Sequence, residues 1–155
     1  MKTFVWDASA IINIKEPDKA GYSPGHSLMK DLSDGWIAGL YRNIFPSIAV
    51  FEVAASVSRK HREGRKILRE FYIMDEHSSI YPIDEAFIRK THQLVSMDGF
   101  SELRGADLIY ACIAYKEKAF LVTMDGHFQK VSHHIRVINL NDSRESAQYR
   151  DMFEE

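Results

Sequence analysis

The chain has 155 residues, of which 45% are hydrophobic and 27% charged, as is typical of one folded domain with an apolar core. Its net charge is −2, so a nucleic-acid partner would have to bind to a local basic segment. The single cysteine, Cys112, excludes disulfide scaffolds and cysteine-based zinc sites. Asp7 falls where a signal peptide needs apolar residues. No segment approaches the roughly 18 apolar residues of a membrane span, so we expect a soluble cytoplasmic protein with no membrane partner.

Short apolar runs alternate with amphipathic segments along the chain. Strands are expected at 3–6, 44–48, 79–83, 119–123 and 135–140. Helices are expected at 8–12, 26–32, 49–60, 65–74, 84–95 and 103–115, with a short one at 126–131. Strands that alternate with helices predict an α/β sandwich with a mostly parallel central sheet. This domain should span 1–140, and the polar segment 141–155 should form a tail or a surface helix.

Four acidic residues occupy positions that a fold would ordinarily fill with neutral or apolar side chains. Asp7 and Asp125 directly follow expected strands, and open α/β sheets bind ligands beyond the carboxyl ends of their strands. Glu52 and Asp107 are lone charges within apolar helical segments, where an unpaired buried charge is costly. Singly, the four can be explained as helix caps, a first-turn residue and a solvent-facing residue. Jointly, they favour one shared site.

A shared site of four carboxylates requires a cation. Two carboxylates about 5 Å apart repel by roughly 3 kcal/mol at an effective dielectric constant of about 20, so four do not remain ionised together without positive charge. Oxygen ligands without cysteine or an ordered histidine pair select Mg²⁺ or Mn²⁺ over zinc. We expect Asp7, Asp107 and Asp125 to bind this ion directly or through water, and Glu52 to be a further ligand or to orient an attacking water. Such an ion can activate water for phosphodiester hydrolysis without a protein nucleophile.

The order and spacing of these residues resemble the PIN-domain nucleases, a family that includes the VapC toxins of toxin–antitoxin modules. The resemblance rests on Asp7-Ala8-Ser9, on Glu52 and on the segments 105–114 and 121–128, and it covers residues 3 to about 140. It implies a three-layer α/β/α fold with about five strands, one or two Mg²⁺ or Mn²⁺ ions held by the corresponding acids, and cleavage of RNA. It also implies that Ser9 and Thr123 orient the acidic cluster, although both residues are equally compatible with ordinary cap or strand roles.

Basic residues near the acids are candidates for RNA binding. The segment 59–69 is rich in arginine and lysine and either follows a phosphate backbone or forms a solvated helix face. Arg104, three residues before Asp107, and His127, two residues after Asp125, lie closer to the expected metal. Both are candidates for contacting the scissile phosphate. The candidates are Arg59, Arg62, Arg65, Arg104 and His127.

Apolar residues in the segments 22–40 and 67–74 exceed what a five-strand core can bury. Together with the resemblance, they predict a homodimer or a complex with a partner chain such as an antitoxin. Two other readings remain open: a non-catalytic RNA- or protein-binding module on the same fold, and a stand-alone RNA-processing nuclease. A haloacid dehalogenase is disfavoured because Ser9 stands where that class needs a second aspartate. A nucleotide switch is disfavoured because the sequence has no Gly-Lys-Ser/Thr loop.

Overall fold

A single parallel sheet organises the protein, whose computed structural model describes residues 1–61, 75–142 and 148–153. Its strands are β1 (Lys2–Trp6), β2 (Tyr41–Pro46), β3 (Ser78–Tyr81), β4 (Phe120–Thr123) and β5 (Arg136–Asn139). They lie in the order β3-β2-β1-β4-β5, and every neighbouring pair is parallel. All of β4 and the last three residues of β1 are buried, as expected for a parallel sheet that is covered on both faces.

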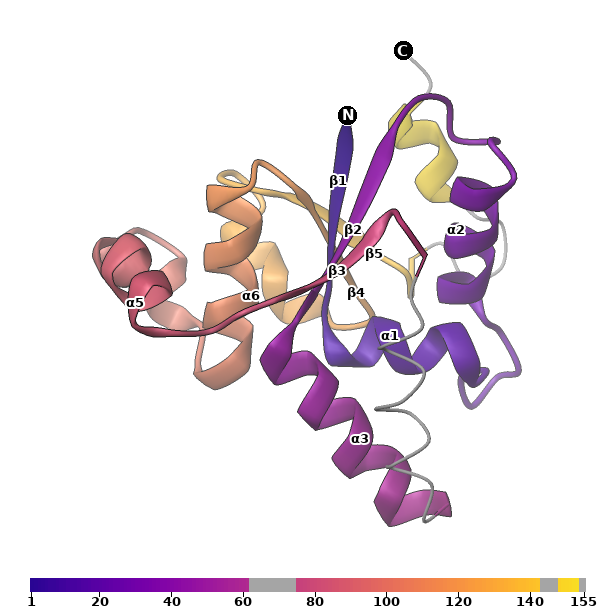
Figure 1. The fold of residues 1–155 in the computed structure, drawn as a ribbon, viewed down its shortest axis with the longest axis horizontal. Helices are drawn as coiled ribbons and strands as arrows, with labels where there is room; N and C mark the ends of the chain where they lie inside the picture. The colour runs from indigo at the N-terminus through magenta and orange to yellow at the C-terminus, as the bar shows by residue number, and fades with distance from the viewer. Residues whose placement is uncertain (62–74, 143–147, 154–155) are drawn as a thin grey trace.

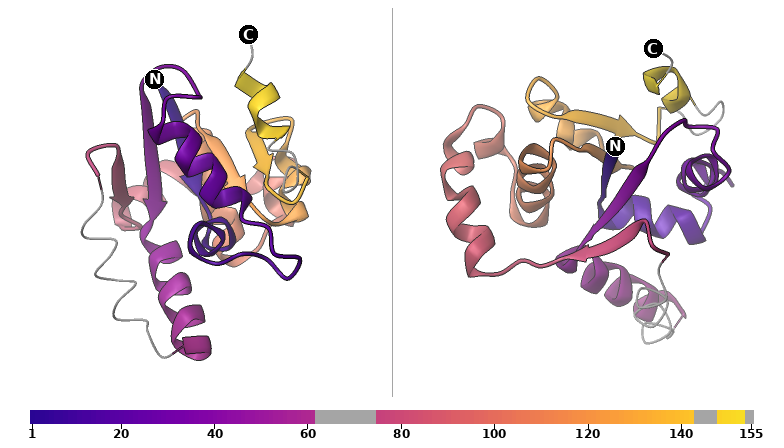
Figure 2. Two further views of the ribbon diagram at one scale, coloured as in Figure 1. Left: turned by 90° about the vertical axis from the view of Figure 1, so that its right-hand side faces the viewer. Right: turned by 45° about the horizontal axis from the view of Figure 1, so that its top comes forward.

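Helices cover the sheet on both sides. The α-helices are α1 (Ala8–Lys15), α2 (Pro24–Ser33), α3 (Ser47–His61), α5 (Glu85–Thr91) and α6 (Gly105–Lys116). The 3-10 helices are η1 (His92–Ser96), η2 (Phe100–Glu102), η3 (Gly126–Val131) and η4 (Gln148–Phe153). In Figures 1 and 2, α1 and α2 lie on one side of the sheet and α5 and α6 on the other. The expected three-layer α/β/α architecture with five strands is therefore confirmed, while the helix expected at 65–74 falls outside the described residues.

Local chemistry explains where several elements begin and end. The Asp84 carboxylate accepts a hydrogen bond of 2.9 Å from the Phe87 amide, as an N-cap residue does, so α5 starts where expected. The α-helix stops at Thr91 instead of continuing to residue 95, because the chain tightens into the 3-10 helix η1. The hydroxyl of the buried Thr91 donates to the Phe87 carbonyl at 2.7 Å at this point, a backbone contact that favours a change of helix geometry.

The strand order fixes where a ligand site can form. The chain leaves β1 to build β2 on one side of it, and later returns to build β4 on the other side. The two central strands β1 and β4 therefore flank a topological switch point, where open parallel sheets bind their ligands. Asp7 follows β1 and Asp125 lies just beyond β4. The Asp7 amide donates to the Val122 carbonyl at 3.1 Å, which holds the ends of these strands together.

The helix η4, in the last part of the chain that the structure describes, packs on the domain. In the segment 141–155, expected to be a polar tail or a surface helix, η4 places the buried Tyr149 against α2. The Tyr149 hydroxyl donates to the Asp31 carboxylate at 2.7 Å, and the Arg150 guanidinium forms two bonds of 2.7 Å to the same carboxylate. Phe153 packs against Phe120, with their ring centres 5.1 Å apart. No helix among the described residues is both long and apolar enough to cross a membrane.

Candidate active site

Asp7 is the most enclosed of the four acidic residues, with 3% of its surface exposed. It caps the N-terminus of α1, and its Oδ1 accepts hydrogen bonds from the Ala10 amide at 2.8 Å and the Ser9 hydroxyl at 2.7 Å. Its Oδ2 accepts a short hydrogen bond from the Thr123 hydroxyl. These donors satisfy both carboxylate oxygens and fix their direction.

Burial nevertheless disfavours the charge of Asp7. Loss of solvent raises the pKa of its carboxyl to about 6, and the nearby charge of Asp107 acts in the same direction. The hydrogen bonds from Thr123, Ser9 and Ala10 oppose this rise without cancelling it. A cation placed beside the carboxyl would lower the pKa and stabilise the ionised form. Asp7 is therefore a buried carboxyl whose ionised form a nearby positive charge would favour.

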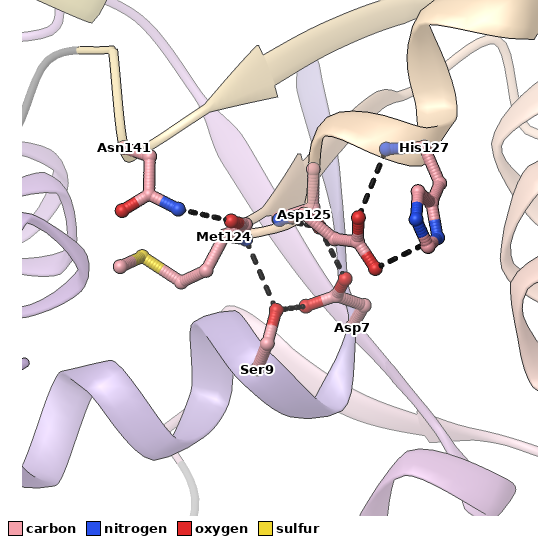
Figure 3. Close-up of polar contacts among 7 residues, drawn as sticks. Asp7, Ser9, Met124, Asp125, His127 and Asn141 are labelled. Carbon is pink, nitrogen blue, oxygen red and sulfur yellow. Dashed lines mark hydrogen bonds and ion pairs between the residues drawn. The ribbon is translucent and has the colours of Figure 1, made fainter.

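Two hydroxyl groups connect Asp7 to the end of β4 (Figure 3). The Thr123 hydroxyl donates to Asp7 and accepts from the Asp125 amide at 2.9 Å. The Ser9 hydroxyl donates to Asp7 and accepts from the Met124 amide at 3.0 Å. The side chains that the family resemblance singled out thus lie between the two strand-end acids, and each hydroxyl uses both its donor and an acceptor site.

Asp107, Asp125 and His127 form a compact cluster. One potential ligand atom from each residue lies within 4.8 Å of those of the other two. Asp125 accepts a hydrogen bond of 2.9 Å from the His127 amide, and its Oδ2 lies 3.3 Å from the His127 Nδ1. Burial and the charge of Asp125 raise the pKa of the Asp107 carboxyl, while His127 acts to lower it. Repulsion between two acids is thus part of the site, as the sequence predicts for a cation-binding cluster.

Glu52 reaches this region through Tyr110. The Tyr110 hydroxyl donates to the Glu52 Oε2 at 3.2 Å, and the tyrosine side chain is buried in α6. Burial raises the pKa of Tyr110, and the charges of Glu52 and Asp7 raise it further. The phenol therefore stays protonated at neutral pH. It bonds to Glu52 and is close enough to Asp7 to feel its charge, while Asp7 in turn feels the charge of Asp107.

The basic candidates for RNA binding fall in different places. Arg104 is exposed at the N-cap of α6, the helix that carries Asp107. Arg59 is exposed near the end of α3, the helix that carries Glu52. Arg62 and Arg65 lie outside the described residues. His127 is exposed and contacts Asp125 directly, so the structure places it among the acidic residues themselves.

Sequence reasoning missed two features of the site. Tyr110 appeared as one more apolar residue of α6, and nothing in the sequence signals its bond to a glutamate 58 positions earlier. The sequence predicts His127 only as a phosphate contact, although its spacing of two residues from Asp125 also allows the two side chains to share a ligand. Because a turn follows Asp125, these residues can face the same point, and both do so here.

The donor set fits a divalent metal ion. Within the described part of the chain, Asp107, Asp125 and His127 supply two oxygens and one nitrogen close enough to share an ion. Asp125 and His127 are partly exposed, so water can complete the coordination, which Mg²⁺ and Mn²⁺ sites usually require. The desolvated Asp7 lies next to this group and is coupled to Asp107.

Comparison with known proteins agrees with this geometry. The family model of the PIN domain matches residues 5–134. FitAB bound to an IR36 DNA fragment has a similar fold, with a TM-score of 0.62 and 18% identity over 87% of this chain and 93% of that chain. The corresponding values for VapBC2 from Rickettsia felis, bound to a promoter DNA fragment, are 0.59 and 17% over 88% and 97%.

A toxin–antitoxin complex from Klebsiella pneumoniae is also similar, with a TM-score of 0.57 and 16% identity over 86% of this chain and 94% of that chain. No curated protein sequence matches the chain. At these identities the structures establish the fold, and the family match covers most of the sequence. The chain belongs to the PIN domain family, whose members are typically nucleases.

Proposed function

We propose that this protein is a metal-dependent endoribonuclease that hydrolyses RNA phosphodiester bonds at the acidic site. The observation that carries the proposal is the convergence of Asp107, Asp125 and His127 beside the buried Asp7, at the switch point of a PIN-domain sheet. An Mg²⁺ or Mn²⁺ ion bound there activates water and neutralises charge on the phosphodiester. The four catalytic acids in this proposal are Asp7, Glu52, Asp107 and Asp125.

The protein groups divide the work of positioning. Asp107 and Asp125 come from two different elements, and their carboxylates lie close enough together that they would hold a common ion. Ser9 and Thr123 hold Asp7 in one orientation by donating to its two oxygens, so the carboxylate needs little reorganisation to act. Glu52 is held by Tyr110, and in this scheme its carboxylate would accept a proton from an attacking water. No serine or cysteine nucleophile takes part in this scheme.

RNA is the substrate that the resemblance to PIN nucleases favours. The exposed Arg104 precedes the Asp107 helix, and the exposed Arg59 follows Glu52 along α3. Exposed cations on the helices that carry the acids can bind phosphates near the scissile bond. Such contacts carry no base information, so the target sequence is set elsewhere.

A toxin of a toxin–antitoxin module is the biological role that we favour, in the cytoplasm and in complex with an antitoxin protein. One support is the fold shared with the toxin–antitoxin complex from Klebsiella pneumoniae. A second is the exposure of large apolar side chains, with Trp36 at 76%, Leu40 at 73% and Phe51 at 68%. Apolar surface of this kind suits a protein partner or a second copy of the chain. A stand-alone RNA-processing nuclease is the second candidate.

Cleavage of RNA with and without metal tests the proposal. We expect purified protein to cut single-stranded or structured RNA in Mg²⁺ or Mn²⁺, and to lose this activity in chelator. Asp7→Asn should reduce cleavage at least 100-fold, the order of effect expected when a group central to metal chemistry is removed. Asp84→Asn, the same change at the exposed N-cap of α5, is the matched control and should cut normally. Cleavage that persists in chelator, or an active and folded Asp7→Asn protein, contradicts the mechanism.

A further inference from the structure

The active-site cluster contains a nitrogen donor that an all-carboxylate site would lack. His127 lies two residues after Asp125 at the start of η3, and one of its ring nitrogens falls within 4.8 Å of ligand atoms from both Asp107 and Asp125. Its side chain is 70% exposed, so no packing against neighbours explains its position. Its ring nitrogen Nδ1 faces Asp125 at 3.3 Å, and Asp107 completes the cluster.

The spacing of the pair suits joint coordination of one ion. Two ligands bound at about 2.1 Å lie about 3.0 Å apart at octahedral angles and about 3.4 Å apart at tetrahedral angles. The His127 Nδ1 and the Asp125 Oδ2 are separated by 3.3 Å. The bond from the His127 backbone amide to Asp125 Oδ1 fixes the carboxylate relative to the backbone that carries the ring, which keeps the two donors close together.

We propose that His127 is a metal ligand, and that the resulting nitrogen and oxygen donor set makes the site prefer a first-row transition ion over Mg²⁺. Imidazole nitrogen is a softer donor than carboxylate oxygen, and it strengthens binding along the transition series more than it strengthens binding of Mg²⁺. Mg²⁺ is a hard ion that favours oxygen and retains its water. This inference rests on the metal site of the proposed function and names the class of ion that the site takes.

A second histidine and aspartate pair supplies a matched control. The His133 Nε2 lies 3.4 Å from the Asp98 Oδ2, both side chains are exposed, and this pair is not part of the three-residue cluster. His133→Gln therefore removes an exposed histidine from a similar ion pair without touching the site. His127→Gln removes the proposed ligand, and His127→Asp replaces nitrogen with oxygen.

The test measures metal binding in the full chain without RNA. Calorimetric titration with MnCl₂ and MgCl₂ should show tighter binding of Mn²⁺ to the unsubstituted protein. We expect His127→Gln to weaken Mn²⁺ binding about tenfold or more, in line with losses seen when metal-site partners are removed, and to change Mg²⁺ binding less than threefold. His127→Asp should bring the two affinities together, and His133→Gln should behave as the unsubstituted protein.

Pulsed electron paramagnetic resonance of the bound Mn²⁺ supplies a direct readout. Modulation from a coordinated ¹⁴N nucleus should be present in the unsubstituted protein and in His133→Gln, and absent in His127→Gln. Absence of that modulation in the unsubstituted protein, or tighter Mn²⁺ binding by His127→Gln, overturns the inference even if the protein cleaves RNA. Nitrogen-ligated Mn²⁺ in a protein that leaves RNA intact supports the inference and rejects the ribonuclease proposal, so the two can fail separately.

Discussion

Asp7→Asn should make the metal-free protein more stable at neutral pH while it removes activity. The unfavourable burial of a charge raises the pKa of Asp7 from 3.8 to about 6. A rise of about 2 units corresponds to roughly 3 kcal/mol by which the ionised carboxyl destabilises the fold above pH 6. Asparagine has a similar shape and no charge, so it removes this cost. The amide forms a weaker hydrogen bond with the Thr123 hydroxyl than the carboxylate does, which lowers the free energy of unfolding by about 1 kcal/mol.

The net gain in the free energy of unfolding is therefore about 2 kcal/mol. In a domain of this size it should raise the melting temperature by about 4 to 8 °C. The gain depends on pH in a defined direction, because the folded state binds the Asp7 proton more tightly than the unfolded state does. The unsubstituted protein loses stability from this residue as pH rises from about 4 through about 6. The difference between the two proteins should be largest above pH 6, where Asp7→Asn is the more stable, and should pass through zero between about pH 4 and pH 5.

Urea unfolding in chelator, at intervals between pH 4 and pH 8, measures this difference. The slope against urea should be the same for both proteins, so that the midpoints report stability. Asp84→Asn is the control, because asparagine and aspartate cap a helix about equally well and Asp84 is exposed. The burial cost assigned to the Asp7 charge is refuted if Asp7→Asn is less stable than the unsubstituted protein at pH 7.5. It is also refuted if the difference in stability between the two proteins does not change with pH.

Three further predictions concern single side chains. Burial favours the neutral form of Asp31, but the hydrogen bonds from Arg150 and Tyr149 outweigh burial and lower the pKa of the carboxyl. Asp31→Asn should therefore lower the free energy of unfolding by about 2 kcal/mol at pH 7. This loss should shrink as pH falls through the lowered pKa. Urea unfolding measures both effects, and an unchanged midpoint contradicts them. Tyr110→Phe keeps the buried ring but removes the hydroxyl that bonds to Glu52. RNA cleavage should therefore fall about tenfold, while the circular dichroism spectrum stays normal. Undiminished cleavage argues against a positioning role for Tyr110. Burial raises the pKa of the Cys112 thiol to about 11, so a thiol reagent at pH 8 should label it only in denaturant, and rapid labelling of native protein would contradict its burial.

Much of the fold follows from the sequence because its signals are local. Five short apolar runs alternate with amphipathic segments, and parallel strands end at one edge of their sheet. The sequence therefore predicts that Asp7 and Asp125 lie at the same edge of the sheet. The Asp84 cap was equally local, since an acidic residue directly preceded the first helical turn.

The remaining features depend on contacts between distant parts of the chain. Thr123 bonds to Asp7 only because β1 and β4 are adjacent in one particular register, which a sequence pattern does not specify. The C-terminal segment looked polar, yet Tyr149 and Arg150 both bind Asp31 more than 100 positions earlier. Their polar atoms are satisfied by a single buried carboxylate, so composition alone gave no sign of the packing.

The same limit applies to Tyr110. In the sequence it continues the apolar surface of α6. Its hydroxyl has a partner at the site only because the fold brings Glu52 of α3 next to it. His127 differs, because its distance from Asp125 along the chain was visible from the start. Its proposed role as a ligand depends also on Asp107, which lies on a separate helix.

The chemical form of the cleaved RNA ends tests the central claim most directly. If the acidic site hydrolyses the phosphodiester with water, RNA cut in ¹⁸O-labelled water and Mn²⁺ should carry one ¹⁸O atom on a linear terminal phosphate from the earliest time points. Cleavage should also survive replacement of the 2′-hydroxyl at the cut site by hydrogen. Mass spectrometry distinguishes this outcome from attack by the 2′-hydroxyl. Early products that end in a 2′,3′-cyclic phosphate without ¹⁸O would contradict hydrolysis at the acidic site.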